Sequence, residues 1–311
     1  MSSEQGAASM TAARVEAGIA DELNGNRRRG FWWDVLRTLV HKHAFDFFFS
    51  AVVIVVIATA ALAAPLLAPA DPNFQDIRAV SSKPSVSHPF GTDNIGRDVF
   101  SRVLYGARVS LTIGVSAVAL GIAAAALIGM VSGYAGRWID LAIQRVVDVM
   151  MAFPTLILIL MIVAVFGASK RNVIFAIAMF IIAAPSRVVR AEVLSVKSRL
   201  YIEAARSMGC GSGRIIFHHI FPNVFHVIII MVSINIGGVI ITEASLSFLG
   251  LGVPPPAPSW GNMIAGPGTY FLRKAPWMVV APGAALALTV YSFNMLGDAL
   301  RDTLDPRLRA R

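Results

Sequence analysis

Long apolar runs without Asp, Glu, Lys or Arg constrain this chain more than any other feature of its sequence. A helix needs about 20 apolar residues to cross a hydrocarbon core of roughly 30 Å. Because lipid offers the backbone no hydrogen-bond partners, such a run crosses as a helix. The runs of about this length lie at residues 47–67, 109–133, 149–167, 224–242 and 278–297. They predict five membrane spans.

A sixth, shorter run begins at Val173 and stays apolar to about Ser186. We expect it to continue as a helix through Arg187, Arg190 and Glu192, which then lie at the water interface because long charged side chains reach towards water. Apolar residues make up 56% of the 311 residues and charged residues 14%, a balance that soluble domains of this length do not have. The sequence therefore predicts an all-α integral membrane protein with six transmembrane helices.

Basic residues indicate which side of the membrane each loop faces. Cytoplasmic loops are enriched in Lys and Arg, and here these residues gather in the N-terminal segment, between residues 187 and 214, and at residues 301–311. Both the N- and C-termini are therefore expected in the cytoplasm. The formal net charge of +9 reflects this distribution. Nucleic acid is not expected as a partner, because the basic residues are spread over many loops rather than gathered on one domain.

The order of these features predicts how the chain is organised. Residues 1–43 have no apolar run and are expected to form a disordered cytoplasmic tail. The first transmembrane helix follows at 44–68, and 69–106 form an external loop that ends in a short interfacial helix, where Val99, Val103 and Leu104 share a face. The remaining regions are a core of five transmembrane helices at 107–300, with a cytoplasmic coupling loop at 195–222, and a cytoplasmic tail at 301–311.

A second outer segment is expected at residues 250–274, between the last two spans. It opens with Pro254, Pro255, Pro256 and Pro258 and is not expected to be regular helix, because proline removes a backbone donor and clashes with the preceding turn. Two sizeable outer segments can together form a landing surface for an extracytoplasmic partner.

The cytoplasmic loop at 195–222 begins with the pattern of a short amphipathic helix. Leu200, Ala204 and Met208 are spaced at i, i+4 and i+8, which predicts one apolar stripe, while Glu203 points away from it. From periodicity alone, lying flat on the membrane and docking on a partner are equally good interpretations.

Glycines follow this helix and predict a sharp turn. Gly209 can adopt a positive φ at no steric cost, and Gly211 and Gly213 tolerate it as well. A second amphipathic stretch at residues 215–221 is expected to stop at Pro222. The loop is therefore predicted to be helix, glycine turn, helix.

The sequence Glu203-Ala-Ala-Arg-Ser-Met-Gly209, with Pro222 thirteen residues after the glycine, resembles the EAA loop of ABC importer permeases. In that family the loop sits in a cleft of the nucleotide-binding subunit. One departure is Phe221, where leucine is usual before the proline. The resemblance implies that the ATPase-coupling residues are Glu203, Ala204, Ala205, Arg206, Met208, Gly209, Ile220 and Pro222. Glu203 then supplies a charged contact, Gly209 the turn, and Ala204, Ala205 and Met208 the apolar surface buried in the ATPase.

The resemblance extends over roughly residues 45–307. The segments at 88–111, 243–252 and 297–306 are similar to those of C-type permease subunits in the dipeptide, oligopeptide and nickel importer family. This implies the type I ABC importer permease fold in a bacterial cytoplasmic (inner) membrane, in contact with membrane lipid. The implied partners are a homologous B-type permease subunit, two ATP-binding subunits and an extracytoplasmic substrate-binding protein.

The resemblance also implies the mechanism and the class of cargo. Closure of the ATPases around the coupling loop reorients the spans, which gives alternating access. ATP and Mg are bound by the partner ATPase subunits, and no cofactor is expected on this chain. Peptides are the expected substrate, with nickel chelates, glutathione and opines as alternatives in the same family.

Rival functions fit the sequence less well. None of the lysines follows a glycine, so the chain has no P-loop and is not expected to be an enzyme that hydrolyses ATP itself. A secondary transporter or channel carries ionisable groups within its spans. Here Asp148, Glu243 and Asp298 fall at the ends of predicted spans. Their expected role is interfacial anchoring or pairing with Arg145 or Arg301.

Two further site types also fit the sequence less well. An intramembrane serine protease needs a serine near a histidine within the membrane. Ser116 is a candidate serine, but His226 is the only histidine of the sequence near membrane depth. A metal site at His218, His219 and His226 has the right ligand type, but a polar interface face explains these residues more simply.

Overall fold

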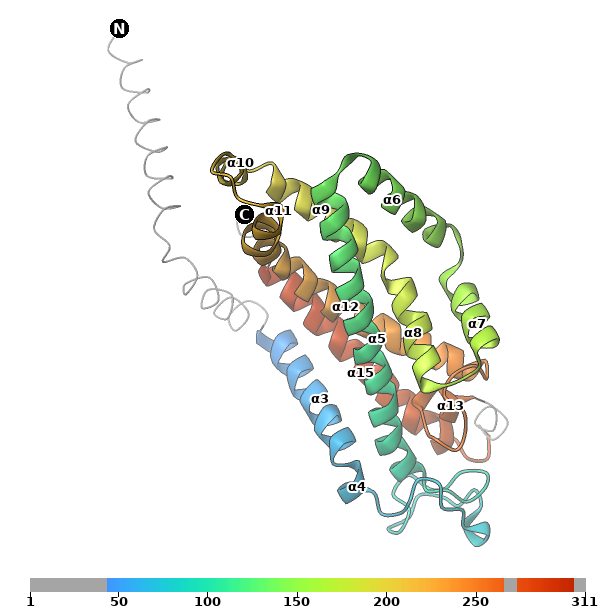
Figure 1. The fold of residues 1–311 in the computed structure, drawn as a ribbon. Helices are drawn as coiled ribbons and strands as arrows, with labels where there is room; N and C mark the ends of the chain where they lie inside the picture. Colours follow the sequence, from blue (N-terminus) through green and yellow to red (C-terminus); the bar gives the residue numbers. More distant parts are fainter. Residues whose placement is uncertain (1–43, 266–272, 305–311) are drawn as a thin grey trace.

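The computed structural model describes residues 44–265 and 273–304, and α-helices dominate both ranges (Figure 1). The expected N-terminal tail at 1–43 and most of the C-terminal tail lie outside the described residues. In chain order the elements are α3 (Ala44–Leu62), α4 (Ala64–Leu67), the 3-10 turn η1 (Ile77–Ala79), α5 (Val99–Ala135), α6 (Arg137–Ala152), α7 (Thr155–Phe166), α8 (Lys170–Ile181), α9 (Ala183–Lys197), α10 (Leu200–Ser207), α11 (Ser212–Arg214), the π-helix η2 (Ile215–Ile220), α12 (Phe221–Phe248), α13 (Trp260–Ile264) and α15 (Trp277–Leu304).

Four helical stretches of the described chain are long and apolar enough to cross a membrane: α3, α5, Ser212–Phe248 and α15. Two bent pairs, α6 with α7 and α8 with α9, pass the same test jointly, so up to six spans are present. The runs predicted at 109–133, 224–242 and 278–297 each lie inside one helix. The all-α membrane fold predicted from the sequence is confirmed.

Each of the two bent pairs has a proline at or next to its break. Pro154 is the N-cap of α7, where α6 and α7 meet at 90°. The run predicted as one span at 149–167 is therefore divided between two helices. Pro185 lies in the first turn of α9, next to a 41° bend after α8. Helix α9 then continues through Arg187 and Arg190, as the sequence predicted.

Helix α5 begins at Val99, so the short interfacial helix expected before the second span is not a separate element. Its residues are the first turns of a 37-residue helix, about 55 Å long at 1.5 Å per residue. Asp98 caps this helix, because its carboxylate accepts the Ser101 N–H at 2.7 Å. Val99 and Val103 are buried against Ala275 and Met278. These residues therefore pack on the protein instead of on the membrane surface.

Small residues let α5 approach its neighbours closely. A Cβ added at Gly121 would lie 2.8 Å from the Ala178 carbonyl oxygen, and one at Gly129 would lie 2.6 Å from that of Ser186. Such approach suits helices in lipid, where association depends on packing. Gly238 differs, because nothing lies within 4 Å of its added Cβ. The glycines of α5 thus have a packing role that Gly238 does not share.

Helix α5 lies at the centre of the bundle and contacts α3, α6, α8, α9 and α12. Figure 1 shows α10 and α11 at one end of the bundle, and α4 with the segment that precedes α5 at the opposite end. The coupling loop and the long outer loop therefore lie on opposite sides, as their predicted positions require.

At the end of the bundle opposite α10 the structure corrects two expectations. Glu243 is not an interfacial anchor: it lies within α12 and is fully buried. The described part of the segment after α12 contains the short helix α13, where no regular helix was expected. Ser259 starts it with a capping box that satisfies the first backbone N–H groups. Asp148 behaves as predicted, since it pairs with Arg145 at 3.6 Å.

Candidate functional site

The first helix of the coupling loop, α10, is seated on the chain's own helices. Ile202 is fully buried, and it packs in an apolar cluster with residues of α5, α9 and α12. Ala205 is 3% exposed. Burying a side chain of the size of Ile202 contributes about 1.5–3 kcal/mol to stability. One face of α10 is therefore buried in a cluster to which α5, α9, η2 and α12 contribute.

The opposite face of α10 is uncovered. Leu200 is 82% exposed and Met208 is 78% exposed, and Glu203 and Ala204 are exposed beside them. The predicted stripe of Leu200, Ala204 and Met208 exists and points outward. Ala205 was expected in the same surface, but its side chain faces the interior. Its role in this structure is to let α10 approach its seat.

The turn after α10 has the hydrogen bonds of a Schellman motif. The Cys210 N–H donates to the Ala205 carbonyl at 3.0 Å, and the Gly209 N–H donates to the Arg206 carbonyl at 2.9 Å. Gly209 has a φ of +80°, as this motif requires. The predicted turn is confirmed at Gly209. Gly211 and Gly213 are not among the positive-φ glycines, so only one glycine of the three forms the turn.

Pro222 does not end the second helix of the loop, which corrects the expectation. It lies in the first turn of α12, and the helix is continuous from Ser212 to Phe248. A proline inside an α-helix removes a hydrogen bond and clashes with the preceding turn. Here the preceding turn is the π-helix η2, which is wider and accommodates the ring. Ile220 is fully buried in the same cluster as Ile202. The loop is thus joined rigidly to α12.

Arg206 of the loop faces α5. Its guanidinium carbon lies 5.5 Å from the centre of the Tyr134 ring, and the Lys197 Nζ lies 5.6 Å from the same centre. Lys197 also donates to the Tyr134 carbonyl oxygen at 2.6 Å, at the carboxyl end of α5. Cations are favourable at this end of a helix and over aromatic rings. Tyr134 therefore joins α5, α9 and α10, a link that sequence reasoning missed.

Comparison with known proteins now decides which class of protein presents this loop. Residues 125–310 match the family described as binding-protein-dependent transport system inner membrane component. Residues 30–84 match the N-terminal transmembrane domain of oligopeptide transport permease C. The chain belongs to this family of inner membrane transport components. It is a permease subunit, and the resemblance drawn from the sequence is confirmed.

Two curated relatives illustrate the similarity of this permease to others. A dipeptide transport system permease protein of Alkalihalophilus pseudofirmus is 44% identical over 227 residues, which cover 73% of this chain and 74% of the relative. A glutathione transport system permease protein of Pectobacterium atrosepticum is 42% identical over 282 residues, which cover 91% of this chain and 92% of the relative. The similarity therefore extends over most of both chains.

Ion pairs brace the ends of the permease helices next to the loop. Arg190 of α9 donates to both carboxylate oxygens of Asp140 in α6, at 2.6 and 2.5 Å. Arg187 of α9 pairs with Asp148 of α6 as a second link between the same two helices. Bidentate arginine–carboxylate pairs fix geometry as well as charge. Helix α6 is therefore tied to α9, the helix that leads into the coupling loop.

The histidines of the loop do not form a metal site with their neighbours. His218 and His219 lie in η2 and His226 in α12. Within residues 44–265 and 273–304, no three His, Cys, Asp or Glu side chains converge in a way that could hold a metal ion.

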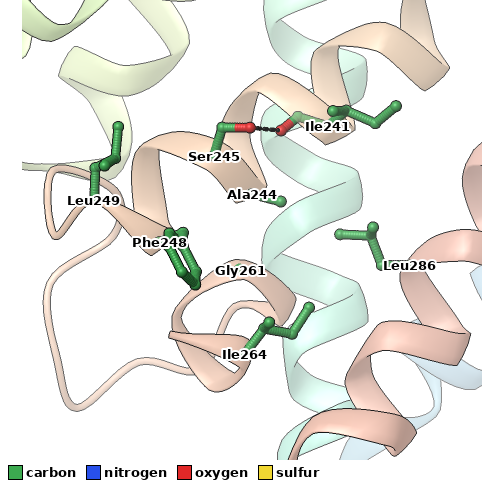
Figure 2. Close-up of a pocket in the computed structure, with 8 residues that line it drawn as sticks. All are labelled: Ile241, Ala244, Ser245, Phe248, Leu249, Gly261, Ile264 and Leu286. Atoms are coloured by element: carbon green, nitrogen blue, oxygen red, sulfur yellow. Dashed lines mark hydrogen bonds between the residues drawn. The ribbon is translucent and has the colours of Figure 1, made fainter. Parts of the chain in front are cut away.

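A pocket of about 410 Å³ lies at the other end of the permease, between α12, α13 and α15 (Figure 2). Its walls are mostly apolar, and the residues that line it are Ile241, Ala244, Ser245, Phe248, Leu249, Gly261, Ile264 and Leu286. The hydroxyl of Ser245 donates to the Ile241 carbonyl of its own helix at 2.9 Å. The pocket therefore presents neither a charged group nor a free polar anchor.

Proposed function

We propose that this permease forms, with a second, similar but distinct permease subunit, the pathway that carries peptides across the cytoplasmic membrane in an ATP-binding cassette importer. Two ATP-binding subunits supply the energy, and an extracytoplasmic binding protein delivers the substrate. One observation carries the proposal. Helix α10 presents Leu200, Glu203 and Met208 outward, while Ile202 and Ala205 hold its other face to the bundle.

The exposed face of α10 has the composition of a docking surface. Two large apolar side chains flank a carboxylate in the first turn of the helix. Buried apolar anchors with a charged neighbour are typical of contacts that bind tightly and in one register. Leu200, Glu203, Ala204 and Met208 are therefore the residues of this chain that contact the ATPase. Arg206 contacts Tyr134 in this structure, so its contact with the ATPase stays a prediction.

The buried face of α10 makes this surface useful for transport. Ile202 is buried in an apolar cluster that also contains side chains of α5, α9, η2 and α12, and Tyr134 adds a second link to α5 and α9. A force on α10 is therefore passed to the bundle through this cluster and through the contact of Arg206 with Tyr134. Closure of the ATPases tilts these helices, and the pathway alternates between its two openings.

Peptides are the proposed cargo because both relatives carry names that fit this class. One is a dipeptide permease and the other a glutathione permease, and glutathione is itself a short peptide. Nickel chelates and opines remain the alternatives within the family. The apolar pocket at the outer end contains no group that could read a peptide terminus. We propose that the external binding protein selects the substrate.

The permease itself binds no nucleotide in this proposal. Its sequence has no Gly-Lys pair for a P-loop, so ATP and Mg are held by the two partner subunits. The coupling loop and both termini lie in the cytoplasm, which the distribution of basic residues supports.

The test is reconstitution of the complete importer in vesicles that contain ATP. We expect ATP-dependent uptake of a labelled peptide that competes with unlabelled dipeptides. The Glu203→Lys variant reverses the charge on the exposed face of α10, so it should insert normally and lose co-purification with the ATPase. Normal co-purification of this variant would show that Glu203 makes no such contact. Uptake that persists without the ATPases would contradict the proposed function.

A further inference from the structure

Glu243 is a buried acidic residue that has no role in the coupling mechanism proposed above. It lies in α12 with 0% of its surface exposed. Among the described residues, the ion pairs do not include it. A buried carboxylate is costly unless hydrogen bonds satisfy its oxygens, and ionisable groups at membrane depth are functional candidates by default. Its contacts therefore indicate what it does.

Serine hydroxyls from separate elements converge on Glu243. Ser110 of α5 donates to Oε2 at 3.0 Å, and Ser247 of α12 donates to Oε1 at 2.7 Å. The hydroxyl of Ser259, the N-cap of α13, donates to the Ser247 hydroxyl at 3.2 Å. The backbone N–H of Trp260 lies 3.4 Å from the Ser110 hydroxyl, which accepts it. Glu243 thus connects α5, α12 and α13.

Close packing supports the same connection. A Cβ added at Gly261 of α13 would lie 2.6 Å from the Ala244 Cα of α12. The Trp260 side chain is 1% exposed, and its indole N–H donates to the Val103 carbonyl of α5 at 3.1 Å. Gly261 and Ile264 also form one wall of the pocket in Figure 2. Helix α13 therefore sits directly on the outer ends of α5 and α12.

The same two helices reach the coupling loop at the other end of the molecule. Ala126 and Met130 of α5 and Val224 of α12 belong to the apolar cluster that seats α10. An α-helix in a packed bundle moves largely as a rod, since its interior resists compression. A displacement of the loop therefore also moves the opposite ends of α5 and α12, where Glu243 holds α13.

We propose that Glu243 is a positioning residue that fixes the outer segment, residues 250–265, to α5 and α12 through its serine hydrogen bonds. The segment then moves with these helices whenever the coupling loop moves them. This inference rests on the proposed function, because it concerns the far end of the same mechanical path. It assigns the outer segment a part in opening the pathway or in sensing the binding protein.

Two substitutions separate hydrogen bonding from charge. Glu243→Leu removes both acceptor oxygens and keeps a similar volume. Glu243→Gln keeps one oxygen and supplies a donor that the rotatable serine hydroxyls can accept. If the role is positioning, the glutamine variant should behave like the wild type. A matched control is Thr242→Val, because the exposed Thr242 hydroxyl donates only to Gly238 of its own helix, at 2.8 Å.

The first measurement reports whether the outer segment is held. Ala257→Cys in a Cys210→Ser background places a single cysteine where the side chain is partly buried against the main apolar cluster. The complete importer is placed in lipid nanodiscs, and the rate of maleimide labelling is recorded. We expect labelling to be roughly tenfold faster with Glu243→Leu, the change that a loss of about 1.4 kcal/mol of hydrogen bonding produces. Glu243→Gln and Thr242→Val should stay within about twofold of the parent.

The second measurement reports whether holding the segment matters for the transport cycle. ATP hydrolysis by the same complexes is recorded with and without the binding protein loaded with a dipeptide. We expect Glu243→Leu to keep basal hydrolysis and to lose roughly tenfold in the stimulated part. A local folding defect would instead reduce the amount of assembled importer and leave stimulation per complex unchanged.

Each outcome decides one part of the inference. Equal labelling of the Glu243→Leu and Thr242→Val variants overturns the holding role. A glutamine variant as damaged as the leucine variant shows that charge is required and overturns the positioning role. Faster labelling with normal stimulation overturns the mechanical link. If the unmodified importer shows no stimulation by any peptide, the proposed function fails, while the labelling rates still decide the role of Glu243.

Discussion

The Gly209→Val substitution tests the geometry of the coupling loop, because the structure isolates one reason for it to fail. Gly209 has a φ of +80°, and no atom lies within 4 Å of a Cβ added there. A steric clash with neighbouring residues is therefore absent. The cost comes only from forcing an L-residue with a branched β-carbon into the left-handed region.

That cost is about 1–3 kcal/mol for a non-glycine residue. This cost lowers the ratio of the native turn to other conformations of the loop by roughly 5- to 150-fold. The Schellman bonds of Gly209 and Cys210 would then be lost in much of the population. Since Ile202 and the spans are untouched, insertion in the membrane should be normal, and ATP-dependent uptake should be lost.

The assay compares uptake into ATP-loaded vesicles at equal amounts of inserted permease. Gly213→Val is the matched control, because Gly213 also has open space around it and is not among the positive-φ glycines. Gly209→Asn should restore much of the uptake, since asparagine tolerates the left-handed region. Normal uptake by Gly209→Val, or an equal loss in Gly213→Val, would refute the reasoning.

Three further predictions concern other parts of the permease. Ile202→Ala should destabilise the packing of α10 by about 2–5 kcal/mol and lower the melting temperature of the detergent-purified chain. Leu200→Ala, at an exposed position, should leave the melting temperature unchanged. Equal effects of the two substitutions would contradict the assigned faces of α10. Tyr134→Leu should raise the ATP hydrolysed per peptide transported and Tyr134→Phe should not, because only the ring contacts the two cations. A single cysteine at Lys83 in a Cys210→Ser background should react with an impermeant maleimide on spheroplasts. Cys210 of the unmodified chain should react only after lysis. The reverse pattern would contradict the predicted topology.

The spans were predictable because a bilayer imposes length and composition on every crossing segment. The run at 224–242 lies in one helix, and the break at Pro154 falls where a missing backbone donor permits it. The start of α5 was not predictable in the same way. Val99 shows its inward face only when Ala275 and Met278, far away in the sequence, pack against it.

The loop shows the same division between local and long-range information. Gly209 was predictable because a positive φ at the end of a helix is a local requirement of the backbone. The burial of Ala205 was not predictable, because its position in the sequence is compatible with either face of α10. The buried face is known only once the cluster that includes side chains of α5, α9 and α12 is known. Pro222 looked like a stop, since the wider turns of η2 have no sequence signature. Glu243 looked interfacial because its partner Ser110 comes from α5, and Ser259, which bonds its other partner Ser247, is the N-cap of α13.

The most direct test of the account is crosslinking from the exposed face of α10. A photo-reactive amino acid at Met208, which is 78% exposed, is compared with one at Val86, which is fully exposed in the outer loop. In membranes that contain the whole importer, Met208 should crosslink to the ATP-binding subunit and Val86 should not. Absence of that product at Met208 in an importer that transports normally, or its appearance at Val86, would contradict the docking of this loop on the ATPase.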